Sequence, residues 1–125
     1  MSKLLMSIDP KYVNSILAGT KRFEYRKVKC RRDIDSILIY ATAPIKKVVA
    51  EVEVIDIIKG PPKRVWEQTS MFAGIEKSFY DKYYLDSSTA VAYALGQVTK
   101  YSKPLSLSDF GIKTAPQSFM YLRGQ

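Results

Sequence analysis

The sequence has no histidine and a single cysteine among its 125 residues, and these shortages exclude several kinds of active site. Zinc sites built from Cys and His cannot form. Catalysis by Ser or Cys paired with His is excluded as well, so any general base must be a carboxylate, a Lys or a Tyr. A hard cation held by oxygen ligands stays compatible with the composition, but no EF-hand and no phosphate-binding Gly-rich loop is visible. We therefore expect no metal site and no cofactor.

Long apolar runs are also missing. No segment approaches the roughly 20 apolar residues of a membrane span, and the first residues lack the apolar stretch of a secretory signal. Cys30 cannot form an internal disulfide by itself, which agrees with a reducing compartment. A length of 125 residues with 46% hydrophobic content favours one globular domain, residues 1–125. We expect a cytoplasmic protein with no membrane partner.

Acidic residues are scarce relative to basic ones, 12 against 20, which gives a net charge of +8 and favours an anionic partner such as nucleic acid. Much of the excess lies between residues 21 and 32, where Glu24 is the single acid. Five basic residues of this stretch are candidates for phosphate contacts: Arg22, Lys27, Lys29, Arg31 and Arg32. The same run is also typical of a solvated strand edge protected from pairing. Nine tyrosines could supply stacking faces for bases.

A helix is predicted just before this basic stretch. Asp9 and Pro10 have the residue types of an N-cap and a first helical position. Apolar residues then recur at helical spacing, and Gly19 is placed to end the helix in a left-handed conformation.

From residue 22 onward the period changes to two, which predicts a strand. If Phe23 and Tyr25 face a core, Glu24 and Arg26 share the opposite side, within reach of Lys21. Two cations and one carboxylate then converge where helix and strand meet. Such a place is suited to binding a polar ligand.

The remaining segments alternate between strand and helix character. Apolar residues at positions 75, 79 and 83, which are Ile, Phe and Tyr, predict a helix that buries this face. The predicted strands are 37–40, 47–55, 89–98 and 119–122, and another helix is predicted over 63–68. Alanines and a glycine on one face of strand 89–98 suggest close approach by a neighbouring element. This order indicates an α+β fold with a curled sheet, not a parallel α/β fold.

The pattern G-x-K-x-x-E-x-R over residues 19–26 resembles the signature of ASCH domains, a family of the PUA-like superfamily. Residues 4–8, 39–44 and 116–119 also look like segments of the small stand-alone ASCH proteins of prokaryotes and phages. The resemblance implies a small mixed β-barrel with helices covering its open ends. It also implies a cleft beside the first helix, lined by the signature motif.

Lys21 is the first candidate within this motif, as a phosphate or carbonyl contact or, if desolvated, as a proton-transfer group. Glu24 either touches the ligand or holds the neighbouring cations in place. Arg26 has the planar fork that suits bidentate recognition of phosphate or a base edge. An ion pair with Glu24 would occupy that fork.

Three further candidates come from the resemblance. Thr42 stands where the family has a small polar residue near the cleft, and Gln117 and Ser118 stand where the family closes its pocket. Each of the three also fits an ordinary turn.

The resemblance implies a binding module for RNA or a nucleotide, with a base held in the Lys21, Glu24 and Arg26 cleft and the basic stretch along the phosphates. Alternatively, the protein is an enzyme, a ribonuclease or an amidohydrolase acting on RNA or modified nucleosides, with Lys21 and Glu24 as the catalytic pair. The amidohydrolase pattern has Thr where this chain has Glu24, so the hydroxyl would have to come from Thr42 or Ser118. A transcriptional regulator, a third role described for small ASCH proteins, would need a helix-turn-helix that the sequence does not show.

Overall fold

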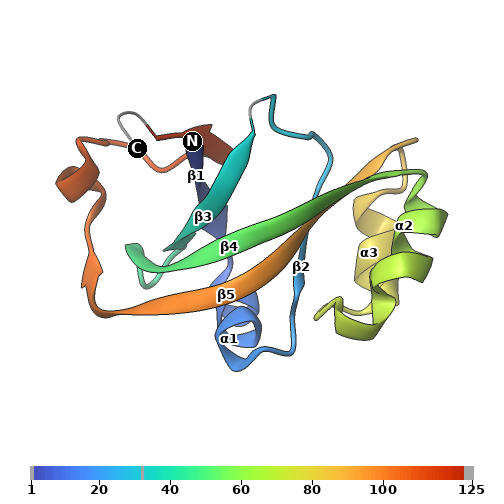
Figure 1. The fold of residues 1–125 in the computed structure, drawn as a ribbon, viewed down its shortest axis with the longest axis horizontal. Helices are drawn as coiled ribbons and strands as arrows, with labels where there is room; N and C mark the ends of the chain where they lie inside the picture. Colours follow the sequence, from blue (N-terminus) through green and yellow to red (C-terminus); the bar gives the residue numbers. More distant parts are fainter. Residues whose placement is uncertain (1, 32, 123–125) are drawn as a thin grey trace.

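The protein is described by a computed structural model that covers residues 2–31 and 33–122 (Figure 1). Six strands form one sheet, with the order β2-β5-β4-β3-β1-β6. The strands are β1 (Ser2–Ile8), β2 (Phe23–Arg26), β3 (Ile34–Ala41), β4 (Lys47–Gly60), β5 (Ala90–Leu105) and β6 (Phe119–Tyr121). β1 and β3 run parallel, and the other neighbouring pairs are antiparallel. The long strands β4 and β5 carry the sheet through its curl, so the predicted α+β barrel class is confirmed (Figure 1).

The first helix, α1 (Pro10–Ala18), begins and ends as predicted. The Asp9 carboxylate accepts a hydrogen bond from the backbone N–H of Lys11, and Pro10 opens the helix. Gly19 ends it with φ of 82°, in the left-handed region where glycine is least strained. Val13 and Ile16 bury the apolar face against the sheet.

The helices α2 (Pro62–Thr69) and α3 (Lys77–Tyr83) lie together at one end of the sheet (Figure 1). The described residues also form two short 3₁₀ segments, η1 (Ser70–Phe72) and η2 (Leu107–Phe110). The predicted buried face of α3 is wrong in part, because Phe79 is 47% exposed and the fully buried rings of this region are Tyr80 and Tyr84. Both rings pack on Ala90 and Ala92 of β5, the small face that predicted close approach. Packing against β5 therefore turns α3 by about one residue from the orientation that its apolar spacing predicts.

The core consists of three clusters. The largest lies between α1 and the inner face of the sheet, and a second lies under α2 and α3. The third covers the other face of β1, β3 and β4 with residues around η2, including Leu5, Tyr40 and Leu122.

The strands at the two ends of the sheet approach each other because the sheet curls. Arg26 of β2 donates to the carbonyl oxygen of Ser7 in β1, at 2.9 Å, and to the hydroxyl of Ser118 just before β6, at 3.1 Å. Farther along, the backbone N–H of Arg31 donates to the hydroxyl of Tyr121 in β6. Hydrogen bonds of side chains thus join β2 and the segment after it to β1 and to the region of β6 across the open seam of the half-barrel.

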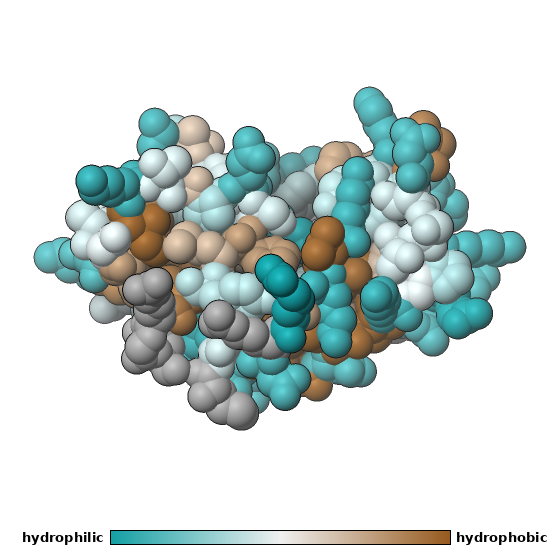
Figure 2. All heavy atoms as spheres, turned by 90° about the horizontal axis from the view of Figure 1, so that it is seen from above, coloured by the Kyte–Doolittle hydropathy of each residue, from teal (hydrophilic) through white to brown (hydrophobic). Residues whose placement is uncertain are grey.

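Large apolar side chains are exposed at separate points of the surface, among them Val28, Ile55, Met71 and Leu85. In the view from above, hydrophilic side chains project around the outline and apolar atoms show between them (Figure 2). Among the described residues, none of the helices has the length and apolar character needed to cross a bilayer.

Candidate functional site

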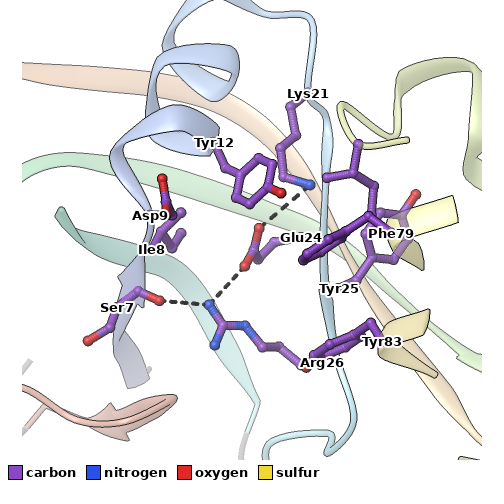
Figure 3. Close-up of a pocket in the computed structure, with 11 residues that line it drawn as sticks. Ser7, Ile8, Asp9, Tyr12, Lys21, Glu24, Tyr25, Arg26, Phe79 and Tyr83 are labelled. Atoms are coloured by element: carbon purple, nitrogen blue, oxygen red, sulfur yellow. Dashed lines mark hydrogen bonds and ion pairs between the residues drawn. The ribbon is translucent and has the colours of Figure 1, made fainter. Parts of the chain in front are cut away.

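A cavity of about 180 Å³ opens where β1, α1, β2 and α3 meet (Figure 3). The signature residues Lys21, Glu24 and Arg26 all line it, together with the aromatic rings of Tyr12 and Phe79. Other lining residues come from β1 and its end, from β2, and from the segment around α3: Ser7, Ile8, Asp9, Tyr25, Ile75 and Tyr83. The motif thus reaches a concave site, as its spacing indicates.

Lys21 is the most unusual residue of the cavity, because its side chain is 2% exposed. The Nζ atom donates to the carbonyl oxygen of Ala73 at 2.9 Å and lies 3.7 Å from Oε1 of Glu24. Burial lowers the pKa of Lys21, and the nearby Glu24 carboxylate opposes that shift in part. The ammonium also faces the rings of Tyr12 and Tyr25, at 5.6 and 5.0 Å from their centroids. Lys21 is therefore a desolvated cation, a rare state for lysine.

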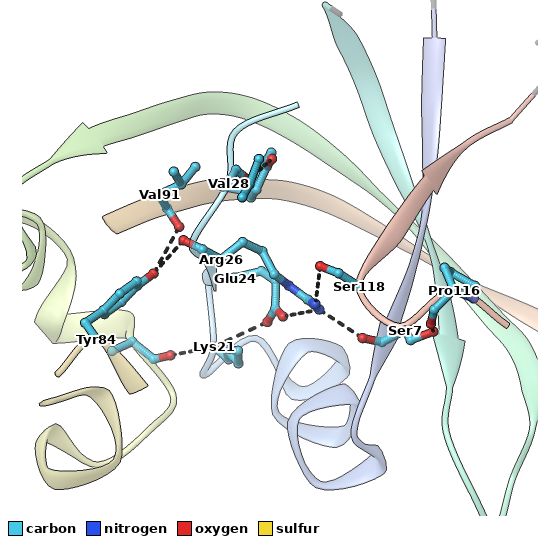
Figure 4. Close-up of polar contacts among 11 residues, drawn as sticks. Ser7, Lys21, Glu24, Arg26, Val28, Tyr84, Val91, Pro116 and Ser118 are labelled. Atoms are coloured by element: carbon cyan, nitrogen blue, oxygen red, sulfur yellow. Dashed lines mark hydrogen bonds and ion pairs between the residues drawn. The ribbon is translucent and has the colours of Figure 1, made fainter. Parts of the chain in front are cut away.

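Glu24 and Arg26 form a close ion pair beside Lys21, with 2.8 Å between Oε2 and Nη2 (Figure 4). Because Glu24 also faces Lys21, one carboxylate lies between two cations. The same Nη2 donates to the Ser7 carbonyl oxygen, and Nη1 donates to Ser118 Oγ. The Nε atom of Arg26 is buried without a hydrogen-bond partner among the described residues. Arg26 thus orients Glu24 and joins the seam at the same time.

Aromatic rings form the walls. Tyr12 on α1 and Phe79 on α3 face each other with ring centroids 5.9 Å apart. Behind them, the hydroxyl of Tyr25 lies 2.8 Å from Thr69 Oγ1, which itself donates to the Val65 carbonyl oxygen. Burial raises the pKa of Tyr25 to about 12, so this phenol stays protonated at neutral pH. The walls are therefore neutral and flat, which suits contact with a planar ring.

Gly74 lies close against Lys21, a contact that no pattern in the sequence indicates. Its φ is +69°, and a Cβ added there would lie 2.3 Å from the Cβ of Lys21. The Lys21 backbone is fixed from the other side, since its N–H donates to the Ser15 carbonyl oxygen. A glycine between two predicted helices was the available signal for a turn, but its contact with Lys21 depends on the tertiary fold.

Tyr12, Phe79 and Tyr83 are further cavity residues that sequence reasoning missed or assigned to a core. Tyr12 lies on α1 beside the predicted apolar residues. Nothing in the neighbouring sequence indicates that its ring lines a cavity. Phe79 and Tyr83 line the cavity because Tyr80 and Tyr84 occupy the positions of α3 and its end that are buried against β5.

The structure places the three candidates from outside the motif differently. Ser118 is exposed, and its hydroxyl binds Arg26, not Lys21. Gln117 is exposed beside it and is not among the described residues that line the cavity. Thr42 follows β3, where its N–H donates to the Ile8 carbonyl oxygen, and it does not line the cavity either. The seam therefore brings Ser118 to the motif and leaves Thr42 outside it.

The basic stretch flanks β2, with Arg22 just before the strand and the other cations in the segment that follows it. Arg22, Lys27, Lys29 and Arg31 are all exposed, and Arg32 lies outside the described residues. The Arg22 guanidinium lies 4.7 Å from the ring centroid of Phe72, and the Lys27 ammonium lies 4.9 Å from that of Tyr83, a cavity residue. Among the described cations of this stretch outside the motif, Lys27 thus contacts a residue of the cavity wall.

The curled six-stranded sheet and its helices form an α+β half-barrel, with the motif residues in a cavity beside the first helix. The family model for the ASCH domain matches residues 6–102. The chain belongs to the ASCH domain family.

Curated relatives include a protein of the same size class and two much longer ones. The ASCH domain-containing ribonuclease of Zymomonas mobilis is 26% identical over 124 residues, which cover 95% of this chain and 83% of that protein. The large ribosomal subunit protein uL22 of Ureaplasma parvum is 33% identical over 87 residues, and the ATP synthase subunit alpha of the same species is 26% identical over 121. Those matches cover 70% and 96% of this chain, but it spans only 28% and 15% of the two Ureaplasma proteins.

Solved structures agree with the fold. The crystal structure of ASCH from Zymomonas mobilis has a TM-score of 0.88 at 24% identity, covering 98% of this chain and 88% of that one. A mutant form of the same protein has a TM-score of 0.90 at 23% identity, covering 99% of this chain and 92% of that one.

Proposed function

We propose that this protein binds a single unstacked base of RNA, or a nucleotide, in the cavity beside α1. The observation that carries the proposal is the desolvated ammonium of Lys21 in a cavity walled by aromatic rings. A buried cation with a lowered pKa is costly, and such groups cluster at functional sites.

The size of the cavity supports a base in preference to a larger ligand. Its volume of about 180 Å³ is close to that of the roughly 150 Å³ cavity known to accept benzene. Drug-sized ligands need about 300 Å³ or more. A single aromatic ring system therefore fits inside, and sugar and phosphate remain at the mouth.

The polar groups are arranged to read the edge of such a ring. A lysine ammonium has three donors, and among the described residues the Ala73 carbonyl oxygen takes one of them, while Glu24 Oε1 lies 3.7 Å away, at ion-pair distance. A donor therefore remains for a carbonyl oxygen or ring nitrogen of a base. Glu24 can accept from an exocyclic amino group, and Nε of Arg26 has no acceptor among the residues that the structure describes.

The basic stretch supports a polyanionic ligand. Exposed cations stand directly before and after β2, the strand that carries Glu24 and Arg26, and could contact the phosphates of a bound strand. Lys27, stacked over Tyr83, is placed at this edge.

The test is retention of a mixed pool of short RNAs by the pure protein over a range of salt concentrations. We expect salt-sensitive binding that is lost in Lys21→Met, which keeps the apolar stem and removes the charge. Lys100→Met, on the exposed part of β5, is the matched control and should bind as the wild type does. Lys27→Gln should reduce the magnitude of the slope of log K against log salt by up to about 0.7, the contribution of one single-strand phosphate contact. RNA binding that is absent at low salt would refute the proposal.

Ribonuclease activity is the second candidate, favoured by the lowered pKa of Lys21 next to Glu24. A neutral Lys21 could take the proton from a ribose 2′-hydroxyl while its oxygen attacks the adjacent phosphorus and the 5′-oxygen leaves with a proton from water. Glu24 would orient the lysine. The relative from Zymomonas mobilis that is named a ribonuclease matches along nearly the whole chain.

The same RNA pool separates the two functions when fragment size is followed together with retention, with Mg²⁺, with Mn²⁺ and with chelator. Cleavage by the wild type and not by Lys21→Met would establish a nuclease. Retention that needs Lys21 without any cleavage would establish a binding module. Activity at equal level in Lys21→Met would point to a contaminating nuclease.

A further inference from the structure

A second hollow, of about 410 Å³, adjoins the cavity on the side of α1 and the loop before α3. Tyr12, Ile75 and Phe79 line both spaces. The hollow is completed by four residues that the cavity does not touch: Lys11, Gly74, Glu76 and Ser78.

The Tyr12 and Phe79 rings form the boundary between the two spaces. They approach within 5.9 Å between centroids, and in Figure 3 they stand on either side of the Lys21 ammonium. Phe79 is 47% exposed, whereas the neighbouring Tyr80 ring of the same helix is buried. An exposed ring at the edge of a base-sized cavity is placed to stack on whatever extends out of it.

The chemistry of the hollow differs from that of the cavity. Lys11 supplies one exposed cation, and Glu76 and Ser78 supply acceptors and a hydroxyl. Neither Lys11 nor Glu76 has an ion-pair partner within the part of the chain that the structure describes, so both charges can meet a ligand. One cation suits one phosphodiester, and a carboxylate suits a ribose hydroxyl that donates to it.

The first cavity cannot enclose a complete nucleotide, so the sugar and phosphate of a bound residue must leave it. On the side of the seam, the Arg26 guanidinium is hydrogen-bonded to Glu24, Ser7 and Ser118. We compare two exits for the sugar and phosphate, one past Lys27 and Tyr83 and one past Tyr12 and Phe79 into the hollow.

We infer that the hollow is a second subsite, which receives the phosphodiester and nucleoside attached to the base in the cavity. Lys11 contacts the phosphate, Phe79 stacks on the second base, and the ligand is at least a dinucleotide. This inference rests on the proposed binding of a base in the first cavity.

Binding of the four ribonucleosides and of the sixteen dinucleoside monophosphates tests the inference. The first 2′-hydroxyl of each dinucleotide is methylated, so that transesterification cannot destroy it. We expect the best dinucleotide to bind the wild-type protein at least tenfold more tightly than the better of its two nucleosides. Lys11→Gln should reduce this ratio at least threefold, and Lys100→Gln should leave it unchanged.

Lys27→Gln decides between the two exits. A ratio that falls in Lys27→Gln and not in Lys11→Gln would overturn the second subsite, because the phosphate would then pass the other exit. Equal affinity for nucleosides and dinucleotides would also overturn it, while leaving base binding intact. If neither set binds and the RNA pool is not retained, the proposed function fails together with the inference.

Discussion

Replacing Gly74 with Ala should displace Lys21 from its buried position. An added Cβ would lie 2.3 and 2.5 Å from the Cβ and Cγ atoms of Lys21 and 2.9 Å from its Cα. The last contact is with the backbone, so rotation of the lysine side chain cannot relieve all of the overlap. Either the loop before α3 or the turn after α1 must move.

Two costs add in this variant. A φ of +69° in a residue with a Cβ costs roughly 1–2 kcal/mol, and overpacking of a close contact costs about 1–3 kcal/mol. We therefore expect the free energy of unfolding to fall by about 2–5 kcal/mol. With a shift of about 4 °C for each kcal/mol in a chain of this size, Tm should fall by about 8–20 °C.

Urea and thermal unfolding followed by circular dichroism measure the effect, and Gly111→Ala is the matched control. Gly111 has φ of +71°, but nothing lies within 4 Å of an added Cβ, so this variant isolates the backbone cost. The excess loss in Gly74→Ala over Gly111→Ala measures the contact with Lys21. Equal losses in the two variants would refute the argument that Gly74 is needed to seat Lys21.

Three further predictions concern the seam and the cavity wall. Arg26→Lys keeps the charge, but an ammonium cannot reach Glu24, Ser7 and Ser118 together as the planar guanidinium does. Urea unfolding should show a loss of about 1–3 kcal/mol in the free energy of unfolding, against little change in the exposed control Arg64→Lys. Equal values for the two variants would show that the guanidinium geometry is not needed. Thr69→Val removes the hydroxyl bonded to Tyr25 at nearly constant volume and should cost about 1–2 kcal/mol, and a neutral result would mean that water or another group satisfies the phenol. The raised pKa of Tyr25, about 12 in the folded protein against about 10 in the unfolded chain, stabilises the fold below pH 10, and this contribution is lost as the pH rises toward 12. Between pH 9 and 11.5 the wild type should therefore lose more unfolding free energy than Tyr25→Phe does, and parallel losses would contradict the assignment.

Local features were predictable where local physics decides them. Asp9, Pro10 and Gly19 delimit α1 because capping and a left-handed turn depend on neighbouring residues alone. The alternation along β4 and β5 was visible for the same reason, although β5 continues to Leu105, beyond the predicted end at residue 98. The strand extends because pairing with β4 continues up to Val48 opposite Leu105.

The orientation of α3 could not be read from its spacing. Ile75, Phe79 and Tyr83 recur at intervals of four, yet Tyr80 and Tyr84 fill the space over the alanines of β5. Two rows of apolar side chains could cover the same surface of the sheet, and the packing against β5 determines which row is buried.

The sequence by itself determined which charged groups belong to the candidate site, because a helix end followed by a strand puts Lys21, Glu24 and Arg26 on one side within eight residues. Only the tertiary structure decided how that site is built. The curl of the sheet brings Ser7 and Ser118 to Arg26, and the loop before α3 brings Ala73 and Gly74 to Lys21. These contacts join residues up to 92 positions apart, and no local pattern encodes them. Burial of Lys21, and with it the lowered pKa, follows from that long-range packing.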